Sequence, residues 1–154
     1  MKGFTLIELV VSIAIGLFLT GLIIANYNSY NDIQVLKQAA LTLKNNFRFA
    51  QSKAMSGDKP SQCTQLSGYS VTFTDASDYS IQALCAPEGL AGASQKVTLP
   101  GGVILSPQPG AITFNVLSRG TTLDAPVTIT LAGFGKQYDL VVNPSGDVSD
   151  LGLQ

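Results

Sequence analysis

The chain has 154 residues, of which 45% are hydrophobic and 12% charged, and its formal net charge at neutral pH is −1. This length allows one domain with a real core, and the sparse, balanced charge argues against a nucleic-acid-binding protein, which would be strongly basic. The sequence contains no histidine, which excludes Ser-His-Asp triads, Cys-His dyads and imidazole metal sites. Its two cysteines suffice for one disulfide but not for a four-cysteine metal site. The composition therefore predicts a non-enzymatic protein with no cofactor.

The first predicted element is a long apolar helix. Residues 4–25 (FTLIELVVSIAIGLFLTGLIIA) contain a single charge, Glu8. A helix of this length spans roughly 33 Å, enough to cross a hydrocarbon core of about 30 Å. Lys2 in front of it predicts a cytoplasmic N-terminus and an extracytoplasmic remainder. A removed secretory signal is the alternative, but no small-x-small cleavage site follows Ile24.

Glu8 is unexpected in a simple membrane anchor, because a carboxylate is costly in an apolar helix. Ser12, Gly16 and Thr20 follow it at steps of four residues. Such a stripe of small residues lets helices approach closely in an apolar medium. We therefore expect this helix to pack against copies of itself, with Glu8 needing a cation from a neighbour. The alternative is a glutamate that snorkels to the interface beside small residues that occur by chance.

The segment GFTLIELVV at residues 3–11 resembles the prepilin-type N-terminus of type IV pilins and type II secretion pseudopilins. The resemblance implies that prepilin peptidase removes residues 1–3 as a leader by cutting between Gly3 and Phe4, and that the new amino group of Phe4 is methylated. It also implies that Glu8, with Thr5 beside it, serves assembly by pairing with the N-terminus of a neighbouring subunit. Further implied partners are other pilin subunits, the inner membrane, and an assembly platform with its ATPase.

An amphipathic helix is predicted to continue over residues 26–57. Apolar residues recur there at spacings of three and four, the pattern of a stripe that packs on a core. These residues are Ile33, Leu36, Ala40, Leu43, Phe47, Ala50 and Ala54. Gly57 and Pro60 predict the end of the helix.

The remaining residues, 58–154, alternate between short apolar runs and turn residues, which predicts antiparallel β-sheet. The expected strands are 68–74, 79–84, 96–99, 103–105, 111–117, 127–131 and 137–142, and residues 89–92 are expected to be a flexible connection. The fold class is therefore α+β and pilin-like, one long N-terminal helix packed on antiparallel sheet. The last forty or so residues also resemble minor pseudopilins and minor pilins, which implies two small sheets.

Cys63 and Cys85 bracket the first predicted hairpin. In an extracytoplasmic domain we expect them to form a disulfide, which should stabilise the fold by roughly 3 kcal/mol. Two separate buried thiols are the alternative.

The predicted function is that of a structural subunit of a type IV pilus or pilus-like filament. It would be made as a single-pass inner-membrane precursor and then incorporated into a surface pilus or a periplasmic pseudopilus. A minor pseudopilin of a type II secretion system and a DNA-binding minor pilin are the alternatives. DNA binding is disfavoured because residues 60–154 contain three basic and seven acidic residues, a net charge of −4. The acid pairs Asp75/Asp78 and Asp147/Asp150 are too sparse for a dedicated calcium loop, so no metal site is predicted.

Overall fold

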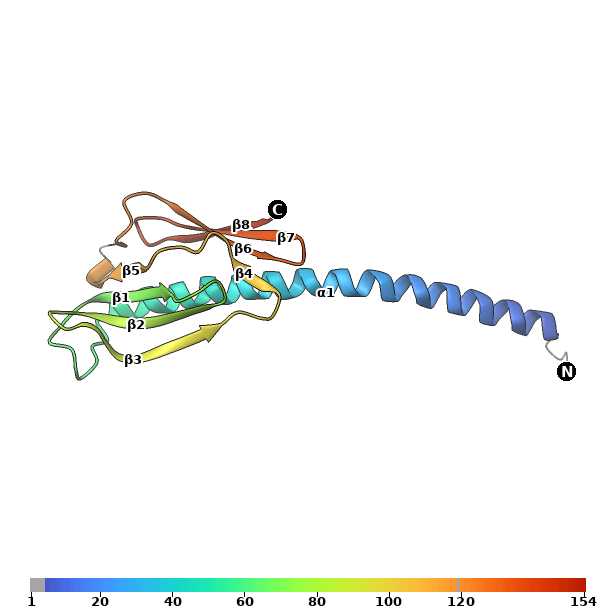
Figure 1. The fold of residues 1–154 in the computed structure, drawn as a ribbon, viewed down its shortest axis with the longest axis horizontal. Helices are drawn as coiled ribbons and strands as arrows, with labels where there is room; N and C mark the ends of the chain where they lie inside the picture. Colours follow the sequence, from blue (N-terminus) through green and yellow to red (C-terminus); the bar gives the residue numbers. More distant parts are fainter. Residues whose placement is uncertain (1–4, 119) are drawn as a thin grey trace. The chain divides into compact units, whose positions relative to one another are not determined.

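The computed structural model describes residues 5–118 and 120–154, with side chains for 5–21, 29–117 and 120–154. The chain divides into two compact units, Met1–Gln34 and Val35–Gln154. The division falls within one α-helix, α1 (Leu6–Ser56). The fold is α+β, with a long N-terminal helix region packed on antiparallel sheets, and it is consistent with a pilin-like fold (Figure 1).

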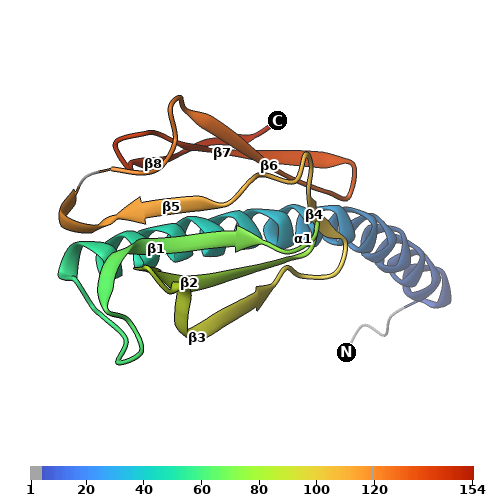
Figure 2. The same cartoon turned by 60° about the vertical axis from the view of Figure 1, so that its left-hand side comes forward.

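The second unit contains two four-stranded antiparallel sheets (Figures 1 and 2). In the first sheet the strand order is β3-β2-β1-β5, and in the second it is β4-β6-β7-β8. The strands of the first sheet are β1 (Gln65–Phe73), β2 (Asp78–Ala86), β3 (Gly89–Thr98) and β5 (Ile112–Asn115). Those of the second are β4 (Val103–Leu105), β6 (Val127–Gly133), β7 (Lys136–Val142) and β8 (Val148–Leu153).

The part of α1 that belongs to the second unit contains no glycine or proline until it ends. Gly57 follows Ser56 with a φ of 65°, a left-handed conformation that glycine adopts without steric cost. The backbone N–H of Gly57 donates to Ala54 O, and that of Asp58 donates to Lys53 O. Both bonds satisfy carbonyls that the helix end would otherwise leave free, so the stop predicted at Gly57 is confirmed.

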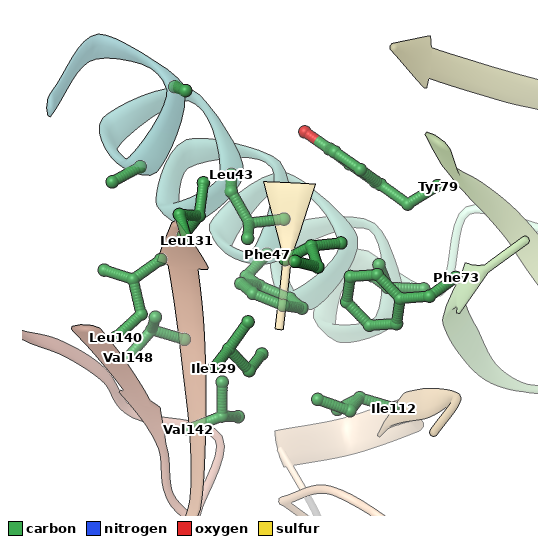
Figure 3. Packing of buried hydrophobic residues seen from close by; sticks show 14 of the residues in the cluster. Leu43, Phe47, Phe73, Tyr79, Ile112, Ile129, Leu131, Leu140, Val142 and Val148 are labelled. Carbon is green, nitrogen blue, oxygen red and sulfur yellow. The ribbon is translucent and has the colours of Figure 1, made fainter. Parts of the chain in front are cut away.

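One face of this helix segment fills the space between the two sheets. Every residue of the predicted stripe from Leu36 onward is buried, and Ala39 joins them. The Phe47 ring lies 6.3 Å from that of Phe73 and 6.1 Å from that of Phe114, both in the first sheet. Figure 3 shows Leu43 and Phe47 with side chains of the first sheet on one side and those of β6, β7 and β8 on the other. The helix therefore provides the common core of both sheets.

A disulfide joins Cys63 to Cys85, with 5.5 Å between their Cα atoms. Both cysteines are buried, together with Ala83, in a small cluster of their own. The segment between α1 and β1 is also held by hydrogen bonds, since the Tyr69 hydroxyl donates to Asp58 O at 2.8 Å and Lys59 Nζ donates to Thr64 O at 3.2 Å. The disulfide therefore attaches this segment to β2.

Three strand predictions differ from the structure. Residues 89–92 are not a flexible connection, because Gly89, Leu90 and Ala91 pair with β2 as the start of β3. The strand expected at 111–117 ends at Asn115, and a short 3₁₀ helix, η1 (Val116–Ser118), follows it. β8 is an additional strand, paired with β7 along the sheet edge. For β3 and β8, backbone pairing with a neighbouring strand, rather than local residue preference, decides the outcome.

Candidate assembly site on the N-terminal helix

The first turn of α1 is closed by Thr5 and Glu8. The backbone N–H and the hydroxyl of Thr5 donate to Glu8 Oε2 at 3.0 and 2.7 Å, and the Glu8 N–H lies 3.4 Å from Thr5 Oγ1. This reciprocal arrangement is a capping box, in which two side chains satisfy backbone donors at the helix start. The Thr-x-x-Glu spacing in the sequence is the signal for it. Glu8 therefore has a partner within its own chain.

The stripe of small residues carries no unsatisfied hydroxyl. Ser12 Oγ donates to Glu8 O at 2.7 Å, and Thr20 Oγ1 donates to Gly16 O. Such bonds to the preceding turn let hydroxyls lie in an apolar environment without losing hydrogen bonds. A Cβ atom placed on Gly16 would meet nothing within 4 Å. The stripe is thus a low, internally satisfied surface on which a second helix has room to pack.

The apolar side chains of this segment are exposed. Ten large ones have relative exposures of 50–81%. They are Leu6, Ile7, Leu9, Val10, Val11, Ile13, Ile15, Leu17, Phe18 and Leu19. A continuous apolar surface of this kind marks a site of contact with a membrane or with protein. Residues 6–19 are therefore a candidate contact surface.

Gly3 and Phe4, the predicted cleavage and methylation positions, lie outside the described residues. The side chains of residues 22–25, within the expected span 4–25, also lie outside them. Within the part of the chain that the structure describes, there is no helix whose length and apolarity suit a membrane crossing.

The carboxylates considered for calcium have partners within the protein. Asp75 Oδ1 accepts hydrogen bonds from the backbone N–H groups of Ser77 and Asp78 at 2.7 and 2.9 Å, and the bonds from Ser77 hold the pKa of Asp75 below its usual value. Asp150 accepts from Lys44 Nζ at 3.2 Å and from the Tyr138 hydroxyl at 3.1 Å. These bonds, the one from Lys44 first, lower the pKa of Asp150. Over residues 5–118 and 120–154 no group of three or more metal-ligating side chains occurs.

Residues 1–24 match the family described as the prokaryotic N-terminal methylation motif. The chain carries the prepilin-type signal of type IV pilins and pseudopilins. No curated protein and no solved structure matches the chain. A prepilin-type signal implies processing by prepilin peptidase, a membrane-anchored precursor and polymerisation with pilin subunits. The motif points to a structural, non-enzymatic family and supports a pilin-like or pseudopilin protein.

Proposed function

We propose that this pilin-like chain is a structural subunit of a type IV pilus or pilus-like filament. It is cut between Gly3 and Phe4, methylated at Phe4, and polymerised through its N-terminal helix. The observation that carries this proposal is the match of residues 1–24 to the methylation motif. The exposed apolar surface of residues 6–19 supports it, because polymerisation gives that surface a protein partner.

Cleavage creates an ammonium group at Phe4, and methylation preserves its charge. When filament helices pack together, this group and the Glu8 carboxylate of a neighbouring copy meet in a medium of low dielectric, where opposite charges attract strongly. Both bonds that Thr5 donates go to one oxygen of Glu8, Oε2. A carboxylate has about four acceptor positions, so Glu8 can cap its own helix and still bind the ammonium of a neighbour. This ion pair between the Phe4 ammonium and the Glu8 carboxylate fixes the position of each subunit along the filament axis relative to its neighbour.

The DNA-binding alternative has little support. Lys44 and Lys53 on α1 lie in ion pairs with Asp150 and Asp58, and residues 60–154 carry a net charge of −4. A DNA-binding surface requires basic side chains that are available to phosphates.

Intact-mass analysis of protein extracted from membranes tests the processing. We expect loss of residues 1–3 and the addition of one methyl group at Phe4. Gly3→Leu should leave the precursor uncut. A mature chain that begins near Asn26 would contradict the proposal and favour a secretory signal.

Two substitutions separate the two roles of Glu8. Glu8→Gln removes the charge but keeps an acceptor at the third helical position, where glutamine also completes a capping box. Thr5→Val removes the capping hydroxyl and keeps the carboxylate. If Glu8 pairs with the Phe4 ammonium, Glu8→Gln should be cleaved normally but largely excluded from filaments, whereas Thr5→Val should incorporate nearly as well as the wild type. The opposite order would mean that Glu8 acts only as a helix cap.

A further inference from the structure

Two bulky residues have an unusual backbone conformation. Among the described residues, Leu117 and Phe134 are the non-glycine residues with positive φ, at 58° and 55°. Large apolar residues rarely adopt this conformation, and where they do it often marks a functional site. Leu117 is nevertheless 70% exposed and Phe134 42% exposed. Contacts within its own chain therefore bury little of the Leu117 side chain, although its backbone conformation is strained.

The two residues lie at opposite ends of the second unit. Leu117 belongs to η1, which follows β5 near the C-terminal end of α1 (Figures 1 and 2). Phe134 lies in the β6–β7 turn at the other end of the sheets. There the Phe134 ring covers the β3–β4 connection so closely that a Cβ on Gly102 would lie 2.8 Å from Cζ of the ring.

A hollow of about 370 Å³ lies beside the same β3–β4 connection, between α1 and the end of β3. Its walls are mostly apolar, and no charged residue lines it. The lining includes Val35, Ala39, Val97, Leu99 and Pro100, with Gln38, Thr42 and Thr98 as polar members. Tyr79 also lines it, and its hydroxyl accepts a hydrogen bond from Asn46 Nδ2 at 2.6 Å. The hollow therefore suits an uncharged apolar side chain.

We propose that Leu117 of one copy inserts into this hollow on a second copy. Leu117 and the hollow lie at opposite ends of one unit, so they cannot meet within a single chain. A contact between two different patches of identical subunits is head-to-tail, and repeated head-to-tail contacts build an open helical array unless the rotation closes a ring. The inference rests on the proposed filament function and names a contact between the globular units, separate from the pairing of Glu8.

Cysteine cross-linking in full-length filaments tests the contact directly. The pair Leu117→Cys and Pro100→Cys, introduced together, should give disulfide-linked dimers and higher oligomers on mild oxidation. Each single variant should give none of this ladder. The matched control pairs Pro100→Cys with Leu151→Cys, because Leu151 is 59% exposed but lies on β8. This control pair should not form the ladder.

The substitution Leu117→Asn distinguishes an effect on the contact between copies from an effect on the folding of one copy. Asparagine tolerates positive φ better than leucine, so the thermal midpoint of the solubilised subunit should stay the same or rise. The association constant of one contact should nevertheless fall at least about tenfold, because burial of a leucine side chain accounts for such a factor. The ratio of variant to wild-type subunit in filaments, normalised to membrane levels, measures this loss, with Leu151→Asn as the control. A purely structural Leu117 would instead show a lower midpoint.

The outcomes distinguish this inference from the proposed function. If wild-type filaments form but the 117–100 cross-link is absent and Leu117→Asn incorporates normally, the inference is wrong and the filament function stands. Cross-linking of Leu117→Cys to a different protein would also overturn it, since the occupant would not be a second copy. Failure of the unsubstituted chain to enter filaments would overturn both proposals.

Discussion

Residues 6–21 and 36–54 lie in the same α-helix, but their apolar side chains have opposite surroundings. In the first segment the large apolar residues are at least half exposed, with Leu6 at 81%. In the second, residues such as Leu43 and Phe47 are completely buried against two sheets. The second segment is apolar on its inner face and, apart from Leu41 and Phe49, polar on its outer one, as expected of a helix that packs on its own chain. The first is apolar on every face except the stripe from Glu8 to Thr20, which is typical of a helix whose surroundings are lipid or other helices.

The largest effect should come from truncating matched phenylalanines in the two segments. Phe47→Ala removes a ring that contacts Phe73 and Phe114, so we expect a loss of about 3–5 kcal/mol in the free energy of unfolding. Phe18 is 69% exposed, and Phe18→Ala should change that free energy by no more than about 0.5 kcal/mol. Denaturant unfolding of the detergent-solubilised subunit measures both. Equal losses would contradict the contrast between the segments.

The disulfide should give the next largest effect, also limited to the second unit. Cys63 and Cys85 are 22 residues apart, and opening a loop of this size should cost roughly 3 kcal/mol. Cys63→Ser should therefore lower the denaturation midpoint of the sheets. Membrane insertion and processing at Gly3 should be unaffected, because they depend on the first segment alone. A processing defect as large as the loss of stability would show that the two units depend on each other.

The sequence predicts the segments of α1 better than it predicts the sheet edges. The spacing of Leu36, Leu43 and Phe47 identifies the buried face, because helical periodicity directly reports which side meets the core. The Thr-x-x-Glu spacing of Thr5 and Glu8 makes their capping box recognisable in the sequence, whereas the role of Glu8 in assembly stays a prediction. The start of β3 was not predictable, since Gly89 and Ala91 have low strand preference and are held by pairing with β2.

The positive φ of Leu117 was equally beyond sequence patterns. Leucine has no preference for that conformation, so the residue type gives no signal for the positive φ that Leu117 adopts in η1. The hollow near Pro100 is likewise formed by α1 and β3 together, which are more than forty residues apart in sequence. Features formed by segments that are distant in the sequence can be identified only in the folded structure.

Gly16→Leu sharpens the comparison within the first segment. A Cβ atom at Gly16 meets nothing within 4 Å in the single chain, and leucine is a better helix former than glycine, so the subunit itself should not be destabilised. Filament incorporation should fall, because a large residue now separates helices that approach along the stripe. Ala14→Leu is a control, since Ala14 lies two residues away, on a different face of the helix. Equal incorporation of both variants would exclude the stripe as a packing surface.

The smallest effect concerns the charges that link α1 to β8. Lys44 and Tyr138 bind the Asp150 carboxylate and lower its pKa. A carboxyl group whose folded pKa is lowered contributes stability above its unfolded pKa of about 3.9, and that contribution is lost as the pH falls through the folded value. Asp150→Asn should therefore lower the thermal midpoint slightly at pH 7, and the difference from the wild type should shrink below about pH 4. High salt should also reduce the difference, because the pair is partly exposed to solvent.

Asp124→Asn, which removes one exposed charge elsewhere in the second unit, controls for net charge. If the midpoint difference of Asp150→Asn stayed constant down to pH 2, the contact would act through packing and not through the ionised carboxylate.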